Sequence, residues 1–348
     1  MRKIFKKLLP LLLGFLLAFS FAGCGSDSRG TGTTGENGGG SENPPEPEVK
    51  TYEVFPDAKF STGFDILGTG YTDDGKIDAA ERDKQKSIKF GRQEPVWHIA
   101  QWYSRNKLEK TEPIITETSF ALSDSSKSVK LNRETGEITL DFDASKDFSA
   151  PQHAATLGSF WPHLLLSPTS VESVKISDCE SMEVRIDFTL NKSVSHAKDF
   201  GVSSLELNSQ FAWFVYVSNL NPGEGYGEFL WLGFNLYDPK RVYAPHNAMQ
   251  DNAGGVAGNY IYTFGADETI GKDKIVKVGK RTGFTMDLKA AVKTALDDAH
   301  KAGFMTHTTV DNASITGMNI GYEMFDVWEL SATIHDMGVR YTKKENAV

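Results

Sequence analysis

Residues 229–237 read FLWLGFNLY, and this stretch carries the clearest structural signal in the chain. Leucine or phenylalanine stands at every second position from 230 to 236, and successive side chains of a β-strand point to opposite faces. The other face is expected to present Trp231, Asn235 and Tyr237, so both faces carry apolar area. The pattern predicts a strand that is covered on both sides or that lines a cleft.

Similar alternation extends on both sides of this strand, from Lys50 to the end of the chain. Glycine, proline, asparagine and aspartate interrupt it at short intervals, as is typical of an all-β sandwich or jelly roll. An amphipathic helix is expected over 287–302, before Gly303 at a position that suits a left-handed C-cap. We therefore predict a mostly β protein, a jelly-roll-like β-sandwich with one amphipathic helix near the C-terminus. The other expected strands cover 96–103, 137–142, 160–166, 182–190, 211–217, 260–264 and 327–334.

The N-terminus has the three parts of an export signal. Four basic residues precede an apolar run over 8–19, and small residues lead to Cys24. The segment resembles the signal of bacterial lipoproteins, except that Phe21 stands where that signal more often has leucine. The resemblance implies that residues 1–23 are removed, that Cys24 carries a lipid, and that the protein is anchored in the cell envelope, outside the cytoplasm. An ordinary cleaved signal with an incidental cysteine is the alternative.

The composition after the signal indicates how the chain is organised. Residues 24–49 consist almost entirely of Gly, Ser, Thr, Asn, Glu and Pro, which predicts a flexible tether without a core of its own. No second linker of this kind divides residues 50–348, so we expect a single domain there, with two domains as the alternative.

The net charge and the cysteine content limit the classes of partner and the covalent links that we expect. The net charge is −9, and an acidic domain without a basic run is a poor nucleic-acid binder. If Cys24 is lipidated, Cys179 is the remaining cysteine, and no internal disulfide forms. We expect a monomer that contacts the membrane through its lipid.

Three segments combine tryptophan with polar side chains, as a sugar-binding surface does. Aromatic rings stack on the apolar faces of sugars, while amides, hydroxyls and imidazoles bond the sugar hydroxyl groups. These strands resemble those of lectin-like jelly-roll proteins that bind or process carbohydrate, and the resemblance implies an architecture rather than an activity. Our leading hypothesis is binding of a poly- or oligosaccharide without catalysis; burial in the core is the competing explanation for each residue. The candidate ligand-binding residues are Trp97, His98, Gln101, Trp102, Trp161, His163, Trp231, Asn235 and Tyr237.

Catalysis on the same fold is the second hypothesis, as a glycoside hydrolase or polysaccharide lyase. Glycan hydrolysis generally needs a pair of carboxylates. Glu183 and Asp187 are expected on one strand face, and this strand loosely resembles the acidic strand of concanavalin-like glycosidases. Arg185 replaces the central acid of that motif, so a solvated ladder of alternating charges is favoured. Glu323 is a further candidate acid. The third hypothesis is an envelope scaffold that binds another protein.

Metal and cofactor signals are weak. The loop over 238–255 could wrap a structural Ca²⁺ through Asp238, Asn247 and Asp251, although their spacing is unspecific. The segment 70–81 matches part of a calcium loop but lacks its first and third ligands, which favours a plain turn. No other cofactor is expected, because no phosphate loop, serine-hydrolase elbow, zinc-protease motif or Cys-x-x-Cys pair is present.

Overall fold

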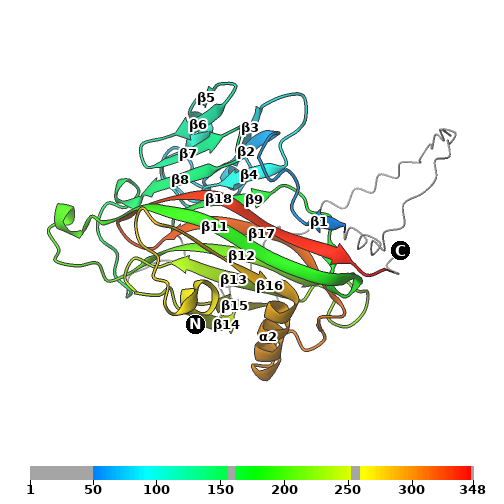
Figure 1. Ribbon diagram of the computed structural model, residues 1–348. Helices are drawn as coiled ribbons and strands as arrows, with labels where there is room; N and C mark the ends of the chain where they lie inside the picture. The colour runs from blue at the N-terminus through cyan, green and yellow to red at the C-terminus, as the bar shows by residue number, and fades with distance from the viewer. Residues whose placement is uncertain (1–49, 156–160, 252–258, 346–348) are drawn as a thin grey trace, which may run out of the picture.

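The computed structural model describes residues 50–155, 161–251 and 259–345. Within these ranges the chain forms two β-sheets, packed face to face as a jelly-roll sandwich, and one longer helix near the C-terminus (Figure 1). This confirms the predicted fold class. The predicted signal peptide, Cys24 and the tether lie outside the described residues. No described helix combines the length and the apolarity needed to cross a bilayer.

The first sheet, sheet A, has eight strands in the order β16-β11-β18-β8-β7-β6-β5, and β1 pairs with β18 beside this path. Its longest pairing joins β11 (Cys179–Ser195) and β18 (Trp328–Lys343), which run antiparallel. The other strands of sheet A are β1 (Thr51–Glu53), β5 (Ile114–Ile115), β6 (Ser119–Ser123), β7 (Lys127–Asn132), β8 (Ile138–Asp143) and β16 (Arg281–Asp287).

The second sheet, sheet B, has ten strands in the order β14-β15-β13-β12-β17-β9-β4-β2-β3, with β10 paired to β17. The pairs β13–β15 and β2–β4 are parallel, and the other described pairs of sheet B are antiparallel. Its strands are β2 (Gly63–Leu67), β3 (Gln85–Lys89), β4 (Trp97–Ala100), β9 (His163–Pro168), β10 (Val174–Lys175), β12 (Ser209–Asn219), β13 (Phe229–Tyr237), β14 (Asn247–Gln250), β15 (Tyr260–Phe264) and β17 (Ala313–Met324).

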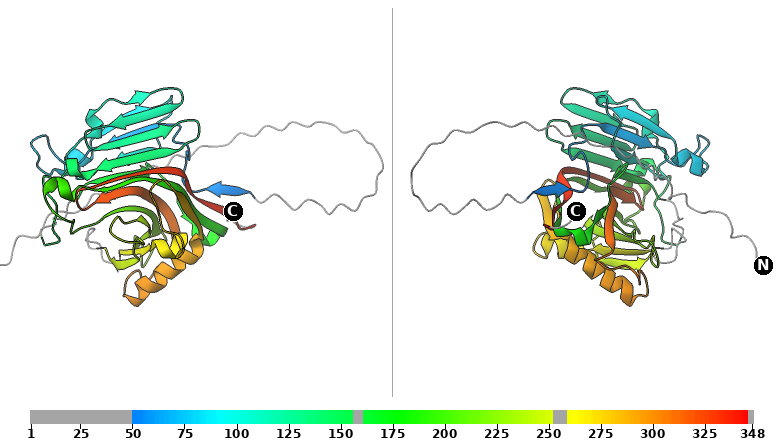
Figure 2. Two further views of the ribbon diagram at one scale, coloured as in Figure 1. Left: turned by 60° about the vertical axis from the view of Figure 1, so that its left-hand side comes forward. Right: turned by 90° about the vertical axis from the view of Figure 1, so that its right-hand side faces the viewer.

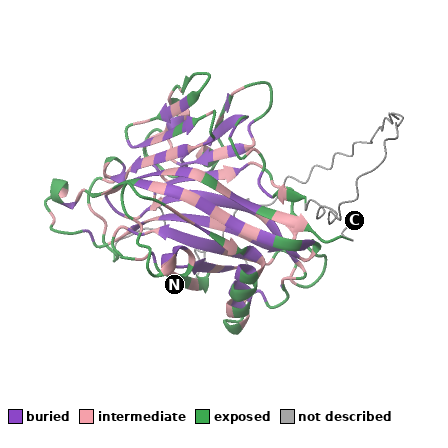
Figure 3. Ribbon diagram, in the orientation of Figure 1, coloured by how far each residue is buried: buried purple, intermediate pink, exposed green. Residues whose placement is uncertain are grey.

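The core lies between the two sheets and consists of the inward-facing side chains of their strands. Buried and partly exposed positions alternate along β11 and β18, as expected for strands with one solvated face (Figure 3). Trp213 and Tyr322 of sheet B are fully buried, and so are Phe142 and Phe188 of sheet A. The Tyr322 hydroxyl donates to the Leu140 carbonyl at 3.0 Å, so its buried polar atom is bonded across the sandwich.

The longer helix, α2 (Leu288–Lys301), agrees with the expected helix to within a residue at each end. The Asp287 side chain caps it by accepting from the Ala290 N–H, and Gly303 follows with φ +84°, the left-handed conformation expected there. The apolar face of α2 is buried in the core, where the helix contacts β11 and β16 of sheet A and β15 of sheet B (Figures 1 and 2). The helix therefore covers an open end between the sheets. The short helices are α1 (Ala79–Arg82), η1 (Leu108–Lys110), η2 (Ala144–Lys146), η3 (Ile176–Asp178), η4 (Ala197–Phe200) and η5 (Asp267–Gly271).

A β-bulge between β12 and β13 changes the side of the sheet on which Tyr237 lies. Phe211 pairs with Tyr237 while Ala212 pairs with Asn235, so Leu236 is an extra residue in β13. Strict alternation places Tyr237 beside Trp231 and Asn235, but the structure places it on the core side. Its hydroxyl donates to Ser193 of sheet A at 2.9 Å.

The close contact of β17 with β9 requires a glycine at 321. Gly321 has φ +150°, and a Cβ at this position would lie 2.0 Å from the Leu164 carbonyl oxygen. We expect Gly321→Ala to lower the free energy of unfolding by about 1–3 kcal/mol, because the two strands must move apart. Urea denaturation measures this loss. Gly91→Ala is the control, since no atom lies within 4 Å of a Cβ there; equal stability of the two variants would contradict the prediction.

Candidate functional site

The side of sheet B that faces away from sheet A carries a mixture of aromatic, amide, imidazole and carboxyl groups. We call it the outer face of sheet B. Alternation with the core residues and the register of β2, β4, β9, β17, β12, β13 and β15 define its members. They include Asp65, His98, His163, Ser167, Gln210, Phe214, Tyr216, Trp231, Asn235, Thr263, Asn319 and Glu323.

One group of these side chains, the Glu323 cluster, consists of Glu323, Trp161, His163, Gln210 and Trp102. Glu323 of β17 is the cross-strand partner of both His163 on β9 and Gln210 on β12. Its Oε2 accepts hydrogen bonds from the Trp161 indole N–H at 3.3 Å and from the Gln210 amide at 3.2 Å. The cluster therefore brings a carboxylate, an amide, an imidazole and indole rings together in one place.

Aromatic rings enclose His163 within this cluster. The Trp161 ring is stacked on the His163 ring with centroids 6.0 Å apart, and Trp102 meets it edge-on at 6.0 Å. Phe325 packs against the Trp161 indole, with ring centroids 4.8 Å apart. Burial lowers the pKa of His163, partly opposed by the charge of Glu323, so the imidazole is held neutral. Nδ1 of this ring lies 3.4 Å from the Trp102 carbonyl oxygen, which can only accept, so Nε2 is left as an acceptor for a hydroxyl group.

A second group, the Trp231 cluster, lies toward the opposite ends of β12 and β13. Tyr216 and Trp231 are cross-strand partners whose rings meet edge-on at 4.8 Å, and Phe229 lies 4.9 Å from the indole. The Trp231 N–H donates to Asp251 at 3.0 Å. Gly317 on β17 leaves room for the Tyr216 ring, because a Cβ there would lie 2.6 Å from it. This cluster is a second aromatic surface with a carboxylate at its edge.

Buried polar atoms without a hydrogen-bond partner lie on the same face. Among the described residues they include Oδ1 of Asp65, Asn235 and Asn319. Each of these residues is less than 9% exposed, and buried polar groups are normally bonded to protein or water. The outer face of sheet B therefore carries hydrogen-bond acceptors without a partner as well as aromatic rings.

His98 lies at the other side of this face, on β4. Its Nε2 is 3.8 Å from Asp65 on the neighbouring β2, and burial lowers its pKa despite that carboxylate. The structure gives no contact between His98 and the Glu323 cluster, so His98 forms a separate pair with Asp65.

Besides Tyr237, two further candidate ligand-binding residues lie away from the outer face. Trp97 is 2% exposed, packs against Phe60 on the core side and donates to the carbonyls of Pro56 and Asp57. Gln101 is fully buried; its amide donates to the Leu67 carbonyl, and its oxygen accepts from a backbone N–H. Trp97 thus holds the loop that follows β1, and Gln101 joins the end of β2 to the start of η1, so neither side chain lines the outer face.

The candidate catalytic acids are divided between the two sheets. Glu183 and Asp187 lie on β11, on the solvated side of sheet A, where they pair with Arg340 at 2.6 Å and Arg281 at 2.6 Å. Arg185, between them, pairs with Glu53 and Asp336. Glu323 belongs to sheet B. The three acids therefore do not converge, and the first two form the ladder of alternating charges that the sequence favoured.

The suggested calcium ligands do not come together either. Asp238 accepts from Asn208 and from the Lys240 N–H, and it pairs with Arg241. Asn247 and Asp251 lie at opposite ends of β14, and Asp251 accepts from Trp231. The end of the predicted loop, residues 252–255, lies outside the described residues.

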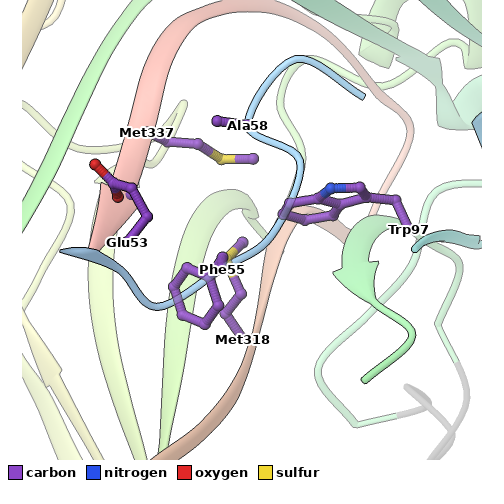
Figure 4. Close-up of a pocket in the computed structure, with 7 residues that line it drawn as sticks. Glu53, Phe55, Ala58, Trp97, Met318 and Met337 are labelled. Carbon is purple, nitrogen blue, oxygen red and sulfur yellow. The ribbon is translucent and has the colours of Figure 1, made fainter. Parts of the chain in front are cut away.

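A small cavity lies between the sheets, near the first described strand (Figure 4). Its volume is about 10 Å³, which holds one water molecule. Phe55, Trp97 and Met318 line it together with Met337 of β18. The cavity is too small for a sugar and is lined mostly by apolar groups, so it is a packing defect rather than a ligand site.

Sequence reasoning did not identify Gln210, Tyr216, Phe325 or Asn319 as site residues. Tyr216 lies on the expected strand over 211–217 and Gln210 directly precedes it, and both stand at positions that alternate with the buried aromatic residues of β12. That alternation is the signal that would have placed them on the outer face.

No protein-family model matches the chain, and no curated protein sequence matches it. Among solved structures, the endoglucanase Cel12A from Rhodothermus marinus is similar with 11% identity and a TM-score of 0.36, over 68% of this chain and 97% of that one. A family 12 xyloglucanase from Bacillus licheniformis is similar with 9% identity and a TM-score of 0.38, over 66% and 97%. The family 11 xylanase from Neocallimastix patriciarum has 9% identity and a TM-score of 0.34, over 67% and 95%. Likeness at this level assigns neither an activity nor a ligand to the chain.

Proposed function

We propose that this protein binds a polysaccharide or oligosaccharide on the outer face of sheet B, without cleaving it. The observation that carries this proposal is the presence of two aromatic clusters on one face, each with polar groups beside the rings. Indole and phenol rings would stack on sugar rings, while Gln210, Glu323 and the neutral His163 would bond hydroxyl groups.

The separation of the clusters favours a ligand of several sugar units. Gln210 and Tyr216 stand on the same face of β12, six residues apart. At about 3.3 Å per residue, the two clusters are separated by roughly 20 Å. A monosaccharide could occupy one cluster alone, whereas a chain of several sugars could touch both.

Loss of one aromatic ring from either cluster should weaken binding. We expect Trp161→Ala and Trp231→Ala each to lower affinity for a bound glycan by about 10-fold or more, since each removes a stacking surface. A glycan array followed by titration calorimetry on the hits measures this. Trp328→Ala is the matched control, because Trp328 is also partly exposed but donates to the Leu207 carbonyl beside sheet A. If no glycan binds, or the control loses as much affinity, the proposal fails and the envelope scaffold becomes the better hypothesis.

Glycan cleavage is the second candidate, and Glu323 is the residue that favours it. Its carboxylate accepts from two side-chain donors and lies beside a neutral imidazole, as a catalytic acid or its conjugate base could. Its cross-strand partners are His163 and Gln210, so no carboxylate stands directly beside it on the neighbouring strands. Paired-carboxylate hydrolysis therefore has less support than binding.

Glu323→Gln separates the two candidates. Glutamine has the same shape and removes the charge, so a hydrolase would lose most of its release of reducing ends while retaining the glycan. A binding protein releases no reducing ends in either form. We expect no release from the unaltered protein; release that Glu323→Gln abolishes would overturn the non-catalytic proposal.

We also propose that the protein acts at a membrane surface, held by a lipid on Cys24. The basic start, the apolar run and the small residues before Cys24 support this proposal. We expect Cys24→Ser to abolish incorporation of labelled fatty acid and to move the protein from the membrane fraction to the soluble or precursor fraction. Cys179→Ser, which removes a buried thiol, is the control. Unchanged labelling in Cys24→Ser would exclude this anchor.

A further inference from the structure

Two carboxylates stand directly opposite each other on the solvated side of sheet A. Asp143, at the end of β8, and Glu329, on β18, are cross-strand partners in an antiparallel pair. Like charges in this position repel each other. Lys192 pairs with Oε1 of Glu329 at 2.7 Å and Lys146 lies 4.0 Å from Oδ2 of Asp143, which leaves the other oxygen of each carboxylate for a further cation. His196, which follows the end of β11, brings its ring to the same point.

The distances from His196 to the two carboxylates can be compared with those in hydrogen bonds and in zinc sites. Its Nε2 lies 3.4 Å from Oε2 of Glu329 and 3.7 Å from Oδ1 of Asp143. One ligand atom from each of the three residues lies within 4.8 Å of the other two. The 3.4 Å contact with Glu329 is a long hydrogen bond, since a charge-assisted N–H···O bond is usually about 2.7–2.9 Å. A tetrahedral zinc ion with bonds of about 2.0–2.1 Å separates its ligands by roughly 3.3–3.4 Å, so the two distances from Nε2 are near those of a zinc site.

The surroundings orient the three groups toward one point. Nδ1 of His196 bonds Asp199 at 2.6 Å, which leaves Nε2 to face the two carboxylates. Metal-binding histidines commonly use a carboxylate in this way to fix the ring. Lys192 occupies the other oxygen of Glu329, Oε1, at 2.7 Å. The hydroxyl and the backbone N–H of Ser145 both donate to Oδ1 of Asp143, at 2.5 and 3.1 Å, and fix this carboxylate in place.

We propose that Asp143, His196 and Glu329 bind a divalent transition metal of the zinc type on sheet A. One nitrogen and two oxygens fill three positions, and all three residues are partly exposed, which leaves a fourth position for water. The ion neutralises the opposed carboxylates and joins β8, β18 and the end of β11. This site is on the other side of the sandwich from the Glu323 cluster and does not depend on the proposed sugar binding.

Equilibrium dialysis of the full chain against ZnCl₂ at neutral pH tests the site. We expect about one Zn²⁺ per chain, and His196→Ala should weaken binding at least 10-fold. Asp199→Asn should weaken it by about 10–100-fold without removing a ligand. His335→Ala is the matched control, because His335 is also partly buried on β18 but pairs with the single carboxylate of Glu137, at 2.6 Å. Its zinc affinity should equal that of the unaltered protein.

Two results would overturn the proposal. One is zinc binding by the unaltered protein that is no tighter than that of His196→Ala; the other is an equal loss in His335→Ala. If His196→Ala does not fold, as judged by circular dichroism, Asp143→Asn and Glu329→Gln replace it, since both keep the side-chain shape. Bound Co²⁺ should give the visible absorption of a site with nitrogen and oxygen ligands. Displacement of Zn²⁺ by equimolar Ca²⁺ would contradict the imidazole ligand, because calcium prefers oxygen alone.

Discussion

The burial of one face of each long strand in the space between the sheets is the constraint on which the rest of the structure depends. Trp213 and Tyr322 fill that space from sheet B, and Phe142 and Phe188 fill it from sheet A. Successive side chains of a strand point to opposite faces, so each residue that lies in the core places its neighbours in the sequence on the outer face. The buried face of β12 therefore determines that Gln210, Phe214 and Tyr216 stand together on the outer face of sheet B.

Local patterns in the sequence were sufficient to predict the class of fold and several of its elements. The strand over 229–237 and the helix near 287–302 have clear periodicity, and both are present. The strand β17 was missed, because Gly317 and Gly321 interrupt its apolar run. Those glycines allow Tyr216 and the β9 backbone to approach closely, so the feature that hides the strand is a packing requirement.

The candidate site was harder to predict than the fold, because it depends on register between distant segments. Trp161 and Glu323 are adjacent only when β9 pairs with β17, and no local signal in the sequence sets that pairing. The side of the sheet on which a residue lies is also hard to predict from the sequence. Trp97 was grouped with surface aromatics but faces the core, and one extra residue in β13 moves Tyr237 to the core side. Alternation predicts which residues share a face, but packing decides which face is inside.

The two outer faces of the sandwich differ in chemistry, and the proposed sites lie on different faces. The first described strand, β1, pairs with the last residues of β18, so the chain enters the sandwich at that end of sheet A. Glu329 is near the other end of β18, about 40 Å away at about 3.3 Å per residue. The first described strand and the proposed metal site therefore lie at opposite ends of sheet A. The Glu323 and Trp231 clusters lie on the opposite side of the sandwich, where a long glycan could run along β12 without contacting sheet A.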